Sequence, residues 1–131
     1  MGKEDYVSLE VAKLLKEKGF DEPCCMMYNE YEESYEFSCY TITKKGFKNS
    51  NECDYNVTVP TLYEAQKWLR NKKIYISALP TRDNGVTVWY YEVVNDNDPD
   101  DIYYTTSQDT YPNYETALNE GIKYALNSFE L

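Results

Sequence analysis

The sequence predicts a single α+β domain over residues 1–131, with one antiparallel, meander-like sheet of about five strands and three helices in the order α-ββ-α-βββ-α. Three observations support this prediction. Residues 61–70 combine a capping box with an apolar helical face, and residues 74–94 form two strand-like runs around an Asn-Gly turn. The connections between elements are short, which suits antiparallel pairing.

The first predicted element is a helix that begins after Ser8 and runs to about Lys18. Ser8 can accept a hydrogen bond from the first turn, and Val11 and Leu15 lie on one apolar face. Gly19 fits the left-handed position that commonly follows a helix. The pattern therefore predicts both ends of this helix.

Two strands are predicted within residues 24–43, because apolar and polar side chains alternate on both sides of a turn at 32–34. We expect residues 44–54 to form an exposed polar loop and residues 57–59 to add a short edge strand. The opposite face of the second strand carries a glutamate, so its core face is expected to consist of Tyr35, Phe37 and Cys39.

The second helix is predicted to begin at a capping box, in which Thr61 and Glu64 exchange side-chain-to-backbone hydrogen bonds. Residues 74–79 and 86–94 then form a hairpin around Asn84-Gly85. Both sides of the 86–94 strand are apolar, so we expect that strand to be central or covered on both faces.

Residues 102–107 are predicted to form the last strand, and Asn113 is the expected N-cap of the last helix. Apolar side chains recur at helical spacing from Tyr114 to Phe129. Gly121 lies within this apolar stripe, which indicates that another element approaches the helix closely there.

Tyrosine is the most unusual feature of the composition, with 15 in 131 residues. Tyrosine gives large, stiff contact area at low entropic cost, which favours a binding surface. It is also a good strand former, so half-buried packing in a sheet explains it equally well. The candidate binding surface predicted from the strand patterns consists of Tyr75, Trp89, Tyr91 and Tyr103.

The net charge of −10 is unevenly distributed, since residues 1–73 carry a net −2 and residues 74–131 a net −8. A field of this sign repels phosphate backbones, so we expect no direct nucleic-acid binding. The acidity suits a basic partner protein or mimicry of nucleic acid, and it also serves solubility.

The chain contains no histidine, which excludes Ser-His-Asp and Cys-His catalysis within one chain. Carboxylates at residues 30–36 cluster around a predicted turn, where solvated acids are expected. Cys24 and Cys25 have acidic and neutral neighbours rather than the cations that lower a thiol pKa. We therefore predict no enzymatic activity and no catalytic residue, with a small carboxylate or cysteine enzyme as an alternative.

No metal site and no cofactor are predicted either. The cysteines lack the two-to-four-residue spacing of zinc ligands and are expected to be reduced, small buried side chains: Cys24, Cys25, Cys39 and Cys53. Asp96, Asp98 and Asp100 imitate the start of a calcium-binding loop. Asp101, however, stands where that loop requires glycine, so a solvated strand connection is the expectation.

Three blocks within the predicted helices carry a resemblance. They are Leu14-Leu15-Lys16-Glu17-Lys18-Gly19-Phe20-Asp21-Glu22-Pro23-Cys24, Pro60-Thr61-Leu62-Tyr63-Glu64-Ala65-Gln66-Lys67-Trp68-Leu69-Arg70 and Tyr114-Glu115-Thr116-Ala117. These blocks resemble a family of small uncharacterised proteins of gut bacteria and their prophages. The resemblance implies a cytosolic protein of mobile-element origin and carries over no activity or site residue.

The sequence begins without a signal-peptide pattern and has no apolar run long enough for a membrane span, so we expect a cytoplasmic protein with no membrane partner. The predicted function is a non-enzymatic protein-binding or accessory module that uses a Tyr/Trp-rich sheet face. Its partner would be another protein or a second copy. The alternative is an acidic inhibitor, encoded by a phage or mobile element, that mimics nucleic acid.

Overall fold

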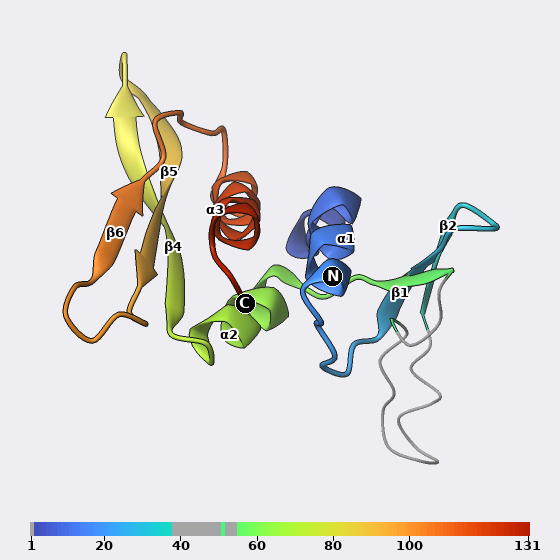
Figure 1. The fold of residues 1–131 in the computed structure, drawn as a ribbon. Helices are drawn as coiled ribbons and strands as arrows, with labels where there is room; N and C mark the ends of the chain where they lie inside the picture. The colour runs from blue at the N-terminus through green and yellow to red at the C-terminus, as the bar shows by residue number, and fades with distance from the viewer. Residues whose placement is uncertain (1, 38–50, 52–54) are drawn as a thin grey trace.

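The computed structural model describes residues 2–37, 51 and 55–131, and it places three helices between two sheets (Figure 1). The helices are α1 (Leu9–Glu17), α2 (Leu62–Arg70) and α3 (Tyr114–Ser128), preceded by a short 3-10 helix, η1 (Lys3–Asp5). The strands are β1 (Met26–Asn29), β2 (Ser34–Phe37), β3 (Asn56–Thr58), β4 (Ile74–Asp83), β5 (Val86–Asn95) and β6 (Tyr103–Thr106). The described helices include none that is long and apolar enough to span a membrane.

The α+β class with antiparallel sheets is confirmed, but the prediction of a single five-stranded sheet is wrong. The described strands form two three-stranded sheets, in the orders β2-β1-β3 and β4-β5-β6. β3 pairs with β1, and α1 and α3 lie between the two sheets, so the sheet edges cannot meet (Figure 1). β5 occupies the centre of its sheet, as its two apolar faces predicted.

All three predicted N-caps form. The Ser8 hydroxyl accepts from the Val11 amide at 3.3 Å, and the Asn113 side chain accepts from the Thr116 amide at 2.8 Å. In the capping box of α2, the Thr61 hydroxyl accepts from the Glu64 amide at 3.1 Å. The Glu64 carboxylate accepts from the Thr61 amide at 2.8 Å. Each bond satisfies a backbone donor that a helix start leaves unpaired.

The end of α1 is also as predicted. Gly19 adopts a φ of +86°, which a residue with a Cβ rarely adopts. The amide of Phe20 then donates to the carbonyl of Leu15 at 2.9 Å, and this bond returns the Phe20 ring to the core, where it is 1% exposed.

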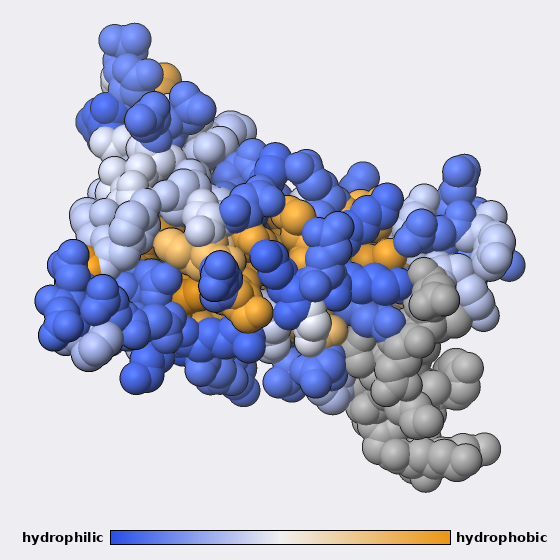
Figure 2. Space-filling model, in the orientation of Figure 1, coloured by the Kyte–Doolittle hydropathy of each residue, from blue (hydrophilic) through white to orange (hydrophobic). Residues whose placement is uncertain are grey.

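The core lies between the sheets and is formed by the helices with β3, β4 and β5. Figure 2 shows apolar residues in the middle of the molecule and hydrophilic residues toward both ends. A Cβ added at Gly121 of α3 would lie 2.8 Å from Cγ2 of Ile76 on β4, so the predicted close approach is confirmed. The largest fully buried side chains include Leu15, Phe20, Leu69, Ile74, Ile122 and Leu126.

The predicted core face of β2 is wrong for the residues that the structure describes. Tyr35 and Phe37 are 49% and 62% exposed, while Cys39 and most of the predicted loop at 44–54 lie outside the described residues. Their partners on β1, Tyr28 and Met26, do pack against the core. β2 is the outer strand of a narrow sheet, so its side chains lie beyond the reach of the helices.

Candidate functional site

The candidate site is built on the β4–β5 hairpin, whose register is set by its turn. Asn84 and Gly85 have φ values of +49° and +79°, which is the geometry of a two-residue hairpin turn. From this turn the two strands pair over ten residue pairs, from Asp83 opposite Val86 to Ile74 opposite Asn95. Directly opposed residues point to the same side of a sheet, so the pairing assigns every side chain to one of two faces.

One face of this sheet packs against α3 and includes Ile76 and Val93, whereas no described element lies over the other face (Figure 1). We call this second surface the open face. Its apolar and aromatic side chains are Tyr75, Leu79, Val88, Tyr90, Val94 and Tyr104, and its polar ones are Ser77, Thr81, Glu92 and Thr106. Asp83 and Val86 end it at the turn.

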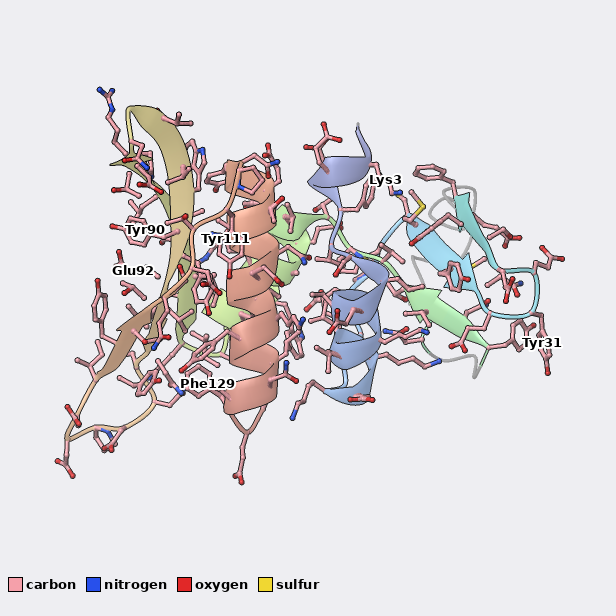
Figure 3. All side chains as sticks on the ribbon, turned by 90° about the horizontal axis from the view of Figure 1, so that it is seen from above. Lys3, Tyr31, Tyr90, Glu92, Tyr111 and Phe129 are labelled. Carbon is pink, nitrogen blue, oxygen red and sulfur yellow. The ribbon has the colours of Figure 1, made fainter. Side chains whose placement is uncertain are left out.

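Tyr90, Glu92 and Tyr104 lie at the centre of the open face. In Figure 3, Tyr90 and Glu92 project from β5 on the side away from α3, while Tyr111 lies on the side toward α3. Partial desolvation raises the pKa of the Tyr104 phenol, and the nearby Glu92 and Tyr90 raise it further. Tyr104 is nevertheless 57% exposed, so these three side chains form a surface group.

The four residues predicted as one binding surface divide between the two faces. Tyr75 lies on the open face, opposite Val94. Trp89, Tyr91 and Tyr103 lie on the face toward α3. Trp89 and Tyr91 are every second residue of β5 counted from Val93, which lies on that face, and Tyr103 lies opposite Asn95, the next residue of the same series. The four residues therefore do not share one face of the sheet, because neighbouring positions along a strand point to opposite sides.

The three residues on the helix side have partners within the chain. The Trp89 ring meets Tyr114 edge to face at 5.6 Å between centroids, and the Tyr103 ring meets Phe129 at 5.5 Å. The Tyr103 hydroxyl also shares a hydrogen bond with the Tyr124 hydroxyl. These ring contacts hold α3 against the sheet, so the role of these side chains is structural.

Tyr91 is the most deeply placed tyrosine of this group. Its ring stacks on Tyr111 at 6.2 Å and packs against Tyr124 at 5.9 Å. Burial raises the pKa of Tyr91 to about 12, with smaller contributions from Tyr111 and Tyr124. The Tyr91 phenol therefore stays neutral across the physiological range.

Sequence reasoning missed Tyr90, Glu92 and Tyr104, although the signal was present. A two-residue turn at Asn84-Gly85 fixes which residues of the two strands oppose each other. Counting outward from that turn places Tyr75 with Tyr90 and Glu92 rather than with Trp89 and Tyr91. A count along the strands separates the two faces, whereas aromatic content alone does not.

The acidic residues of the second half do not share one surface. Asp83 lies at the β4–β5 turn, and the segment 96–101 joins β5 to β6 at the opposite end of the sheet (Figure 1). Glu115 and Glu120 belong to α3. A nucleic-acid mimic needs its carboxylates along one face, so this distribution disfavours that alternative.

The environment of Cys24 does not favour covalent chemistry. Cys24 is buried, as predicted, and burial raises the pKa of its thiol far above the usual range, with Glu64 adding to the shift. A thiol held in this way is a poor nucleophile. Across the described ranges, no group of three or more Cys, Asp or Glu side chains is arranged to hold a metal ion. Cys39 and Cys53 lie outside these ranges.

A second concave region lies beside the other sheet, between η1, the start of α1 and the start of α3. It is an open groove of about 800 Å³. Its apolar lining comes from Tyr6, Val7, Leu9, Met26, Tyr35, Phe37 and Val59. Lys3, Glu4 and Glu115 lie at its polar side and give no dominant charge. The groove therefore offers apolar contact without a chemical group that would select a ligand.

Comparison of the chain with protein-family models, with curated proteins and with solved structures finds no match in any of the three. Function must therefore be argued from the site.

Proposed function

We propose that this chain is a non-enzymatic protein-binding module and that the open face of β4-β5-β6 is its contact surface. The observation that carries the proposal is a sheet face that combines tyrosine and aliphatic side chains and has no described element over it. Contiguous apolar surface of this kind commonly marks a protein interaction site. Tyrosine adds contact area and a hydrogen-bonding hydroxyl at little entropic cost.

The scaffold supports recognition through the face rather than through strand addition at the β4 edge. The Gln66 side chain donates to the Ile76 carbonyl at 2.6 Å, which occupies a backbone acceptor at that edge. Pro80 lies farther along the same strand and has no amide hydrogen to donate. Both features block a foreign strand from pairing with β4.

Site-specific photo-crosslinking in the cells that express the protein tests this proposal. A photoreactive phenylalanine analogue replaces Tyr104 on the open face, and the same analogue replaces the exposed Tyr31 beside the other sheet as a matched control. We expect a discrete crosslinked protein from position 104 and none from position 31. No product at 104, or equal products at both positions, would contradict the proposal.

A pair of neighbouring substitutions separates binding from folding. Tyr90→Lys introduces a charge on the open face and should abolish the crosslink at position 104 while the fold is retained. Trp89→Lys removes the ring that packs against Tyr114 and should lower the urea midpoint instead. Circular dichroism and urea unfolding of both variants decide whether a lost crosslink reports lost contact.

A further inference from the structure

We propose that the open face recognises a lysine or arginine side chain of its partner, with Glu92 as the ion-pair acceptor and the tyrosine rings around it as the walls of the site. The occupant is an extended, cationic segment of another protein. This inference rests on the proposed function, because it names the chemistry of the partner that the open face binds.

Glu92 provides the carboxylate of the proposed site. Glu92 is half-buried at the centre of the sheet, with Ser77 and Thr106 opposite it on the neighbouring strands. Among the described residues, no lysine or arginine lies within ion-pair distance of it. A carboxylate without a cation beside it in its own chain gains Coulomb energy when a partner brings one, and the hydrogen bonds of such a pair are strong.

The rings beside Glu92 suit the same cation. Tyr90 and Glu92 are successive positions of β5 on the open face, and Tyr104 lies opposite Val94, the next β5 position on that face. A cation over the face of a tyrosine or tryptophan ring is attracted by the negative face of the ring quadrupole. The protein uses this contact elsewhere, since the Lys72 ammonium lies 4.6 Å from the centroid of the Trp68 ring.

Charge complementarity favours a basic protein over nucleic acid or a second copy. No lysine or arginine belongs to the open face of the described strands. Residues 74–131 contain only two cations, Arg82 and Lys123, and Lys123 is paired with Glu10 at 2.9 Å. A phosphate backbone would be repelled by this surface, and two copies would bring net charges of −10 together.

The size of the face also favours a segment over a second copy. β4 and β5 are ten residues long and β6 is four, so at about 3.3 Å per residue and about 4.8 Å per strand the face covers about 380 Å². A stable dimer buries about 800 Å² on each partner. An extended peptide across three strands fits the smaller area, with alternate side chains directed onto the face.

Backbone-amide NMR titration of the folded protein tests this inference with three probes. The probes are short peptides that alternate valine with lysine, with serine or with glutamate. We expect the lysine peptide to shift the amides of Tyr90, Glu92 and Tyr104, and to bind at least about tenfold more tightly than the serine peptide. Added salt should reduce this difference, because it screens the ion pair.

Two isosteric variants assign the effect to Glu92. Glu92→Gln should weaken binding of the lysine peptide by about tenfold, whereas Asp101→Asn removes the same charge from the exposed β5–β6 connection and should change binding by less than about twofold. Equal losses in the two variants would overturn the role of Glu92, since they would reflect net charge alone.

The three peptides also separate this inference from the proposed function. If the serine peptide binds the open face as tightly as the lysine peptide, cation recognition is wrong while the face remains a protein-binding surface. If no peptide shifts the open face, both proposals fail. A concentration-dependent dimer in light scattering that Tyr90→Lys dissociates would replace the foreign segment with a second copy.

Discussion

The two sheets have the same strand number and pairing type, but they contribute very differently to the fold. β4 and β5 pair over ten residue pairs and supply the fully buried Ile74, Ile76 and Val93. β1 and β2 pair over four and supply no fully buried side chain, so the fully buried side chains of the described strands of this sheet come from β3, while Met26 and Tyr28 of β1 pack at the edge of the core. Strand length and helix coverage, rather than strand number, decide which sheet holds the molecule together.

This difference changes the meaning of an exposed aromatic ring. Tyr31, which is 81% exposed beside the β1–β2 turn, lies on a peripheral hairpin with little core contact. Tyr90 lies on β5, whose other face packs against α3, and Tyr104 lies on β6, whose neighbouring Tyr103 packs against Phe129 at the end of that helix. A rigid support holds contact residues in place before binding and so lowers the entropic cost of association. The open face is the better binding surface for that reason.

The largest expected effect comes from emptying the core on the side of the longer sheet. Ile122→Ala removes a fully buried side chain of α3 and should lower the free energy of unfolding by about 2–5 kcal/mol. Met26→Ala truncates a half-buried side chain of β1 and should cost about 1 kcal/mol. Urea unfolding followed by circular dichroism measures both, and equal losses would contradict the unequal roles of the two sheets.

The sequence predicted the elements with strong local signals. The caps at Ser8, Thr61 and Asn113 and the turn at Asn84-Gly85 depend on side chains within a few residues of the backbone groups that they satisfy. Such bonds need no knowledge of the rest of the chain. The helices and the hairpin were predictable for this reason, whereas the central position of β5 was predicted from the apolar side chains on both of its faces.

The arrangement of the sheets depends on contacts far apart in the chain, and alternation does not report these. A period of two says that a strand has two faces, but not which strand it pairs with or which face a helix covers. Tyr35 and Phe37 alternate like core residues and are exposed because β2 is an outer strand. Glu92 was missed because a lone carboxylate is inconspicuous in the sequence, and only a count outward from Asn84-Gly85 places it on the same face as Tyr75 and Tyr90.

A smaller effect is expected from a substitution at Gly121, where α3 contacts the longer sheet. Gly121→Ala would place a Cβ 2.8 Å from Ile76 and 3.0 Å from Tyr91, and this overpacking should cost about 1–3 kcal/mol. The gain in helix propensity returns about 1 kcal/mol, so the net loss is about 0–2 kcal/mol. Urea unfolding measures the loss. Asn127→Ala, on the exposed side of α3, is the control and should not destabilise the protein.

The smallest expected effect is a dependence of the free energy of unfolding on pH, which arises from the phenol of Tyr91 at the same contact. Burial raises the pKa of Tyr91 from 10.0 to about 12, so folding favours the neutral phenol. The stability associated with this shift is fully present below pH 10, where the phenol is neutral in both states, and it is lost as the pH rises through about 12. Because Tyr91 is only half-buried, water screens part of the effect.

Tyr91→Phe removes the ionisable group and keeps the ring, so its stability should fall less steeply than that of the wild type over this window. Urea midpoints measured from below pH 10 to about pH 12, with reductant present, give both slopes. Tyr31→Phe removes a hydroxyl from a ring beside the peripheral sheet and should keep the wild-type slope. Parallel slopes for Tyr91→Phe and the wild type would mean that the phenol of Tyr91 is as well hydrated in the fold as in the unfolded chain. The contact between α3 and the longer sheet would then be looser than its ring stacking on Tyr111 indicates, and the contrast between the two sheets would be correspondingly smaller.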